Sequence, residues 1–161
     1  MTAFRFHSIA LCVVLACVTY RCSAENATAA TPFLSCAEKK DPISVRVGGC
    51  TSLPCQLPKG QTASMEVDFE VDQDVEQLDA VVTAYALGVV IDYPLDQKNA
   101  CFSLTNAECP LDKYEEVTYR LALPVAKTYP SISLAVEIAL KDKNKRSMMC
   151  YKLNLEVVDA A

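Results

Sequence analysis

The sequence predicts an all-β domain, built as an immunoglobulin-like two-sheet β-sandwich. After the first 24 residues, apolar and polar residues alternate through most of the chain, turn residues separate the alternating runs, and helical periodicity is sustained nowhere. Short strands with one apolar face bury that face most simply when two sheets pack together. The chain has no tryptophan, so it lacks the core Cys–Trp–Cys pattern of true immunoglobulin domains.

The first 24 residues are typical of a secretory signal peptide. Arg5 provides a basic start, residues 9–18 form a short apolar run, and Ala24 ends a small-residue cleavage site. The run is shorter than the roughly 20 apolar residues that span a bilayer, although a retained signal anchor is the alternative. We expect cleavage after residue 24 and one secreted domain over 25–161, with its core at about 36–157.

The charge of the expected mature domain disfavours nucleic acid as a partner. Loss of Arg5 and Arg21 leaves 13 basic and 20 acidic side chains, a net charge of −7. Phosphate binding needs clustered lysine and arginine, which this balance does not provide. No apolar stretch after the expected leader is long enough for a membrane span. We also expect the domain to be a monomer.

Six cysteines follow the leader, whereas the only histidine, His7, lies within it. An even number of cysteines in a secreted chain predicts disulfides, and six cysteines allow 15 pairings between which sequence alone does not choose. Proximity favours Cys50–Cys55 and Cys101–Cys109, which leaves Cys36–Cys150 to join the two ends of the domain. A metal site is the alternative, but no C-x-x-C pair or histidine supports it, so we expect none.

The expected strands are six alternating runs, in order 43–47, 65–71, 81–93, 117–123, 132–140 and 149–157. The second run is the cleanest, with one apolar and one wholly acidic face, and we interpret its acids as an ordinary solvent-facing sheet surface. The third is longer and more apolar, and Gly88 predicts a bulge within it. The polar gap at 142–146 is short enough for a hairpin between the last two strands.

The residues outside the leader do not favour catalysis. Triad chemistry needs a base beside the nucleophile, usually histidine, and no histidine follows His7. An S-x-x-K motif, a glycine-rich phosphate loop and an EF-hand loop are also absent from the sequence after residue 24. We therefore predict a protein that is not an enzyme and needs no cofactor.

The apolar inner faces of the two sheets have two possible uses. Side chains that fill the gap make a plain sandwich, which alternation alone favours. Slightly small or splayed side chains would leave a dry pocket able to hold an acyl chain or a ring system. Alternation does not separate these cases.

Short motifs around the cysteines resemble the ML family of lipid-recognition proteins. In chain order they are Gly49-Cys50, Pro-Cys-Gln-Leu at 54–57, Lys59-Gly60, Cys-Pro-Leu at 109–111, Leu-Pro-Val at 123–125 and Tyr-Pro-Ser-Ile at 129–132. Each motif alone is weak evidence for the family, but the ordered set together with six cysteines is strong evidence. Within that family the set is most similar to the Niemann–Pick type C sterol carriers, especially their arthropod members.

The resemblance implies a lipid pocket between the sheets and the same three disulfide pairings. It implies that Tyr93 and Val125 line this pocket and that Tyr129 and Pro130 lie at its mouth. Ordinary core or rim aromatics are the alternative for the two tyrosines. Separately, Asn26 begins an Asn-Ala-Thr sequon, a weak prediction of glycosylation close to the expected new terminus.

Several residues depart from the sterol-carrier pattern. Tyr93 stands where phenylalanine is familiar, so its hydroxyl needs a polar partner or water. Asp92 replaces a proline, Lys113-Tyr114 replaces a Lys-Gly pair, and Ile138 takes the place of a tryptophan. These changes bear on the ligand and the pocket size rather than on the fold.

The resemblance implies a secreted carrier of a sterol or fatty-acid-like lipid, placed outside the cell or in the lysosome. Its partners would be the lipid, a membrane surface and a membrane sterol transporter. The alternative is an innate-immune protein that binds microbial lipid and docks to a receptor, since the same pocket would serve both.

Overall fold

The computed structural model describes residues 29–160, and the expected leader over 1–24 and the sequon at Asn26 lie outside this range. The elements within it are strands β1 (Leu34–Ser35), β2 (Ser44–Val47), β3 (Cys55–Pro58), β4 (Thr62–Glu70), β5 (Leu78–Ala86), β6 (Val89–Tyr93), the 3₁₀ helix η1 (Ala100–Ser103), β7 (Glu116–Pro124), β8 (Ser133–Asp142) and β9 (Ser147–Val158).

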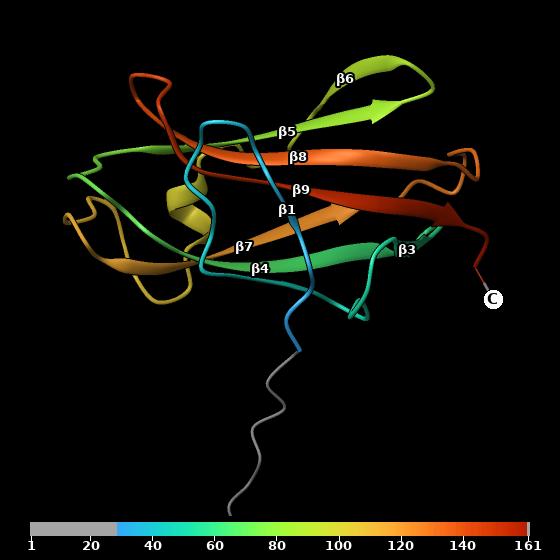
Figure 1. Cartoon of the computed structure of the whole chain (residues 1–161), viewed down its shortest axis with the longest axis horizontal. Helices are drawn as coiled ribbons and strands as arrows, with labels where there is room; N and C mark the ends of the chain where they lie inside the picture. Colours follow the sequence, from blue (N-terminus) through green and yellow to red (C-terminus); the bar gives the residue numbers. More distant parts are fainter. Residues whose placement is uncertain (1–28, 161) are drawn as a thin grey trace, which may run out of the picture.

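These strands form the predicted two-sheet sandwich. Sheet A has six strands in the order β1-β9-β8-β5-β6, with β3 pairing in parallel with the last part of β9. Sheet B has three strands in the order β2-β4-β7. The two sheets lie face to face, with β5, β8 and β9 in one layer and β4 and β7 in the other (Figure 1). Strands β6 and β7 are therefore neighbouring open edges of opposite sheets.

The alternation in each strand sets its inner face. In β4 the inner residues Met65, Val67 and Phe69 are fully buried, and their register partners on β7 are Leu121, Tyr119 and Val117. Burial of apolar surface contributes roughly 25 cal/mol per Å², so these faces dominate the free energy of folding.

The acids on the outer face of β4 form an ion-pair ladder across sheet B. Glu66 lies between Arg46 of β2 and Arg120 of β7, at 3.6 and 2.6 Å. Asp68 accepts hydrogen bonds from Arg46 at 2.9 Å and from the Thr118 hydroxyl at 2.8 Å. The hydrogen bond from Arg46 lowers the pKa of Asp68, and Arg120 acts likewise on the pKa of Glu66. The acidic face is thus structural as well as solvated.

The bulge expected at Gly88 is wrong, because the chain reverses there. Leu87 and Gly88 both have positive φ, 52° and 77°, and connect β5 to β6 as a two-residue hairpin turn. Positive φ at both central residues is the geometry that matches the twist of hairpin strands. The continuous apolar pattern of 81–93 hid the reversal, since both strands present apolar residues to the same side.

Two short strands were not predicted, and another strand begins later than predicted. The short strands β1 and β3 escaped prediction because two to four residues carry too little alternation. Ile43 lies just before β2 and is 56% exposed, so it is not the core residue that its apolar character suggested. The predicted hairpin at 142–146 is confirmed, and Asp142 closes it by accepting from the Asn144 and Arg146 amides at 2.8 Å each.

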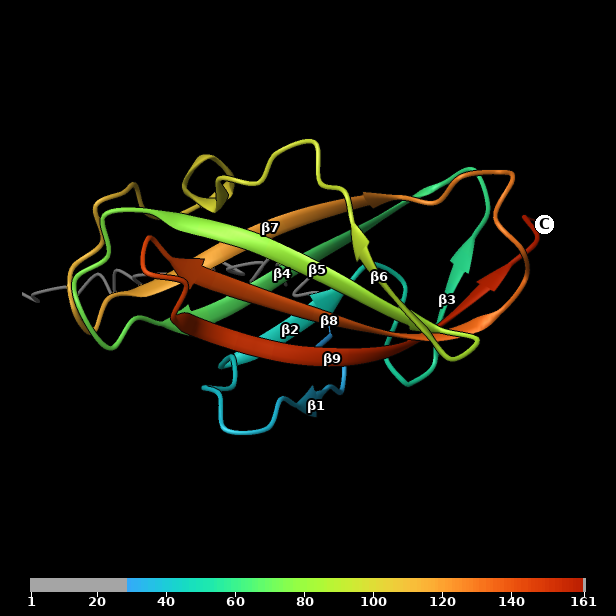
Figure 2. The same ribbon diagram turned by 90° about the horizontal axis from the view of Figure 1, so that it is seen from above.

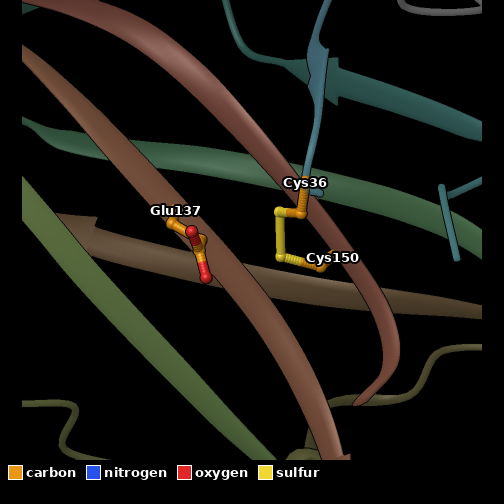
Figure 3. Close-up of side chains that lie close together, drawn as sticks. All are labelled: Cys36, Glu137 and Cys150. Carbon is orange, nitrogen blue, oxygen red and sulfur yellow. A yellow bond between two sulfur atoms is a disulfide. The ribbon is translucent and has the colours of Figure 1, made fainter. Parts of the chain in front are cut away.

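Three disulfides join Cys36 to Cys150, Cys50 to Cys55 and Cys101 to Cys109. The two short bonds are the pairs that proximity favoured, and the long one joins the two cysteines that were left. Their Cα–Cα distances of 5.7, 5.3 and 5.7 Å lie within the ordinary range for disulfides. Cys36–Cys150 ties the segment after β1 to β9 (Figure 3). The two shorter bonds close local loops.

Candidate functional site

An apolar cavity of about 410 Å³ lies between the two sheets at one end of the sandwich. This volume falls within the range of roughly 300–1,000 Å³ that is typical of small-molecule sites. Its lining residues are Leu57, Val82, Ala84, Ala86, Leu87, Val89, Ile91, Tyr93, Pro94, Leu123, Pro124, Val125, Tyr129, Pro130, Ile132, Leu134, Val136, Leu155 and Val157. The two tyrosine hydroxyls are the only side-chain polar groups in this set.

The distribution of side-chain sizes explains why this end is hollow. At the other end the gap is filled by large buried residues, among them Phe69, Leu78 and Met149. At the hollow end, β5 turns Ala84 and Ala86 toward the gap, and neither side chain reaches far enough to fill it. The cavity therefore results from small residues at inner strand positions.

All four residues predicted to contact lipid line this cavity, although they come from different elements. Tyr93 ends β6, Val125 directly follows β7, and Tyr129 and Pro130 lie in the connection to β8. Val125 is buried, whereas Tyr129 is 41% exposed. This arrangement agrees with a wall position for Val125 and a mouth position for Tyr129, and their contact with lipid stays a prediction.

The hydroxyl of Tyr93 has the polar partner that the sequence required. It donates a hydrogen bond to the carbonyl oxygen of Pro124 at 3.0 Å. Tyr93 belongs to the edge strand of sheet A and Pro124 to that of sheet B, so this bond bridges the open side of the sandwich. Burial and the nearby Tyr129 raise the pKa of Tyr93, and the hydroxyl stays protonated at neutral pH.

Backbone hydrogen bonds hold Val125 rigidly in the cavity wall. Its amide donates to the carbonyl of Gln61 at 2.8 Å, and its carbonyl accepts from the amide of Gly60 at 2.6 Å. Gly60 has φ +77°, a conformation that favours glycine. The Lys59-Gly60 and Leu-Pro-Val motifs thus meet at one place and aim the Val125 side chain at the cavity.

The rim of the cavity exposes a cluster of apolar residues on the β5–β6 hairpin. Leu87 is 82% exposed, and Val89, Val90 and Ile91 are each at least half exposed. The hairpin projects beyond the layers at the end where β7 connects to β8 (Figure 1). We call these four residues the rim hairpin.

Most of the chain matches the model of one protein family. Residues 30–157 match the model of the ML domain, which spans most of the sequence. The chain belongs to the ML domain family. The match covers all nine strands of the described sandwich, from β1 to nearly the end of β9.

Curated relatives of this ML domain include two animal cholesterol transporters. It is 33% identical over 126 residues to "NPC intracellular cholesterol transporter 2" of Mus musculus, a match that covers 78% of the chain and 83% of the relative. It is 29% identical over 131 residues to "NPC intracellular cholesterol transporter 2 homolog a" of Drosophila melanogaster, a match that covers 80% of the chain and 88% of the relative.

Solved structures agree with the ML domain fold. A Niemann–Pick type C2 protein from Japanese carpenter ant superposes with a TM-score of 0.71 at 21% identity, covering 79% of this chain and 99% of that one. Chicken MD-1 complexed with lipid IVa gives a TM-score of 0.51 at 15% identity, covering 76% of this chain and 85% of chicken MD-1. At these identities the likeness establishes the fold alone.

Potential metal ligands gather at one place in residues 29–160, namely Cys36, Glu137 and Cys150 (Figure 3). The two sulfurs are bonded to each other, so neither is a thiolate able to bind a metal. Glu137 instead pairs with Lys39 at 3.0 Å and with Lys152 at 3.3 Å. These three residues therefore contribute a disulfide bond and surface ion pairs to the ML domain.

Sequence reasoning missed most of the residues that line the cavity. Alternation places Leu134, Val136, Leu155 and Val157 on an inner face, but it does not say which end of that face is hollow. The signal that was available is the pair of alanines on β5, because small residues at successive inward positions leave a gap that larger neighbours do not fill.

Proposed function

We propose that this protein is a secreted carrier that binds a sterol or another hydrophobic lipid in the apolar cavity and transfers it between membranes. The observation that carries the proposal is the cavity of about 410 Å³, whose side-chain lining is apolar apart from two tyrosine hydroxyls. Such a wall offers little to a water-soluble ligand, because few polar groups are available to replace the ligand's bonds to water.

Binding in this cavity needs only physical forces. A lipid that buries about 400 Å² of apolar surface gains roughly 10 kcal/mol before the costs of association. The disulfides and the paired strands keep the cavity open without a ligand. The proposed mechanism is therefore burial and release of one lipid, with no chemical step.

The names of the relatives support a sterol as the first ligand to test. These relatives include NPC intracellular cholesterol transporters, among them those of mouse and fruit fly. The predicted pocket residues of this chain also line a cavity in the expected place. We propose the same class of ligand here, although Tyr93 stands where phenylalanine is familiar in sterol carriers and adds a hydroxyl to the cavity wall. Ile138 is fully buried and is not among the residues that line the cavity.

A second candidate is recognition of microbial lipid for an immune receptor. The fold likeness to chicken MD-1, whose structure holds lipid IVa, favours this alternative. The closer sequence relatives favour transport, so we place the carrier first.

Identification of the bound lipid separates the two candidates. We would purify the protein from a eukaryotic secretion host, extract it with organic solvent and analyse the extract by mass spectrometry, then measure binding of cholesterol and of lipid IVa. Saturable cholesterol binding supports the carrier, and preference for lipid IVa supports the immune candidate. Absence of binding to any apolar lipid would contradict both.

We propose that residues 1–24 direct secretion and are removed, leaving the domain over 25–161. The basic start and apolar run of the leader support this. In residues 29–160 the structure contains no helix of the length and apolarity needed to cross a membrane. Amino-terminal sequencing of the secreted protein tests the cleavage site after Ala24.

The rim hairpin is suited to contact a lipid surface during transfer. Exposed apolar residues normally mark a partner or membrane site when they form a contiguous patch, and this patch adjoins the cavity. We expect Val90→Asp to slow sterol transfer between phosphatidylcholine vesicles about tenfold, since a charge resists entry into hydrocarbon. Equilibrium affinity for sterol in the absence of vesicles should change less than about twofold, because Val90 is 65% exposed and does not line the cavity.

A matched control for this prediction is Leu34→Asp. Leu34 is exposed on β1, away from the cavity rim, so the substitution adds the same charge elsewhere. Equal slowing of transfer in both variants would mean that overall charge, rather than the rim hairpin, sets the rate.

We expect lipid affinity to vary less than about twofold between pH 5.5 and 7.5. His7 is the only histidine, and ordinary carboxyl and tyrosine pKa values lie near 4 and 10. The resolved shifts move away from neutrality, since Arg46 lowers the pKa of Asp68 and burial raises the pKa of Tyr119 to about 12. A carboxylate with a lowered folded pKa stabilises the fold above its unfolded pKa and loses this effect only as pH falls through the folded value.

The measurement is sterol affinity by fluorescence titration across that pH range, together with urea unfolding at the two ends. A change in affinity of tenfold or more with unchanged stability would contradict the prediction. It would show that a group titrating near neutrality controls the cavity.

A further inference from the structure

We propose that a chamber lined by both polar and apolar residues, beside the apolar cavity, binds the hydroxylated head of a neutral amphipathic lipid whose apolar part fills the cavity. This inference rests on the proposed function, because it names the chemistry of the other end of the same ligand. It adds a second subsite, which we call the side chamber.

The side chamber has a volume of about 600 Å³ and adjoins the apolar cavity. The two share Tyr93, Pro94 and Pro124 as lining residues, so they lie on opposite sides of one wall. The chamber is bounded by β7 and by the connection from β6 to η1, which runs beside the edge of β7 (Figure 2). One ligand molecule that passes this wall would occupy both spaces.

The wall between the two spaces is held by a single side-chain hydrogen bond, from the Tyr93 hydroxyl to the Pro124 carbonyl at 3.0 Å. A ligand hydroxyl that reaches this point could replace the tyrosine as the donor to the same carbonyl. The displaced Tyr93 hydroxyl can in turn donate to the oxygen of the ligand hydroxyl, so both donors keep a partner and opening the wall for an alcohol costs little. A purely apolar ligand offers no such replacement.

The edge of β7 supplies hydrogen-bonding groups inside the side chamber. Antiparallel pairing points alternate residues toward the partner strand and away from it. The backbone amide and carbonyl of Thr118 point away from β4, because the carbonyl accepts from the Thr105 amide at 3.0 Å and the amide donates to the Asn106 side chain at 2.7 Å. By this alternation, the amides and carbonyls of Arg120 and Ala122 also point away from β4, along the chamber.

The β-bridge between Leu104 and Tyr119 brings the Ser103 carbonyl to the Arg120 amide. The edge groups of β7 left facing the chamber are therefore the Arg120 carbonyl and the amide and carbonyl of Ala122, to which no group in residues 29–160 hydrogen-bonds. Ser103, Thr105 and Gln97 add further polar side chains to the wall. Donors and acceptors thus stand together, which suits a head group that both donates and accepts, such as glycerol or a sugar.

The charges around the side chamber favour a neutral head over an anionic one. Its one cation, Arg120, is already paired with Glu66 at 2.6 Å. Asp96 adds a carboxylate to the rim, which repels an anion. We therefore infer hydroxyl groups rather than phosphate or sulfate as the chemistry recognised.

The test compares two probes with the same palmitoyl chain, monopalmitoylglycerol and methyl palmitate, as competitors of fluorescent cis-parinaric acid. We expect the wild type to bind monopalmitoylglycerol at least about fivefold more tightly, as one additional net hydrogen bond would give. Ala122→Phe fills the side chamber from β7 and should remove this preference while affinity for methyl palmitate changes less than about twofold. Ser103→Phe fills it from the opposite wall and provides a second variant in case the first does not fold.

Glu116→Phe is the matched control, because Glu116 lies on the same face of β7 but outside the chamber. It should keep the wild-type preference. Equal affinity of the wild type for both probes, or a preference that survives in the folded chamber variants, would overturn the side chamber and leave the carrier function intact. Failure of the wild type to bind either probe or cis-parinaric acid would instead contradict the proposed function itself.

Discussion

Replacement of Val125 by phenylalanine should reduce lipid affinity at least about tenfold, or about 1.4 kcal/mol, while the domain stays folded. Val125 lines the cavity, and its backbone is held on both sides by Gln61 and Gly60. The larger ring therefore has nowhere to turn except into the space that a ligand needs. Because that space is empty of protein, the substitution adds volume without overpacking the filled end of the core.

The measurement is saturation binding of cholesterol, with urea unfolding to verify stability. Val158→Phe is the matched control, since Val158 is the neighbour of the cavity residue Val157 but does not itself line the cavity. Unchanged affinity in a folded Val125→Phe protein would exclude this cavity as the binding site. Similar losses in both variants would point to a general effect on the end of the sandwich.

Removal of the disulfide between Cys36 and Cys150 should produce the largest loss of stability. The bond closes a loop with a sequence separation of 114, and the loop-entropy estimate for such a length is about 5 kcal/mol. Typical domains have only about 5–15 kcal/mol of unfolding free energy, so the variant is expected to be marginal at body temperature. The experiment is urea unfolding of the double variant Cys36→Ala, Cys150→Ala.

The matched control is Cys50→Ala, Cys55→Ala. That bond spans a separation of only 5, for which the same estimate is about 2 kcal/mol. The long closure should therefore cost about 3 kcal/mol more than the short one. Equal costs would mean that local packing around the cysteines, rather than loop length, determines how much each bond stabilises.

The strands could be predicted where one face is apolar and the other is strongly polar. Residues 65–71 predicted β4 because Met65, Val67 and Phe69 alternate with acids, and the strand is observed at Thr62–Glu70. The hairpin at Gly88 was missed because both of its strands are apolar toward the same side. There the period-2 signal continues through the turn, and only the positive φ of Leu87 and Gly88 reveals the reversal.

The candidate site was predicted in part, and only through family resemblance. Motifs pointed to Tyr93, Val125, Tyr129 and Pro130, all of which line the cavity. The inner faces of β8 and β9 contribute as many lining residues, yet their alternation continues unchanged into the filled end. Whether an inward-facing valine contacts a ligand or another side chain depends on the residues that face it from the opposite sheet. The sequence of a single strand does not contain this information.

By itself the sequence determined the class of the fold, its cysteine count and its lack of any histidine after His7, because alternation and composition are local properties. Only the tertiary structure decided that the sandwich is hollow at one end, that the Tyr93 hydroxyl reaches Pro124, and that a second chamber with a mixed polar and apolar lining lies behind that contact. Each of these depends on residues from opposite sheets meeting across a gap. Such distances arise from packing, so no run of consecutive residues contains them.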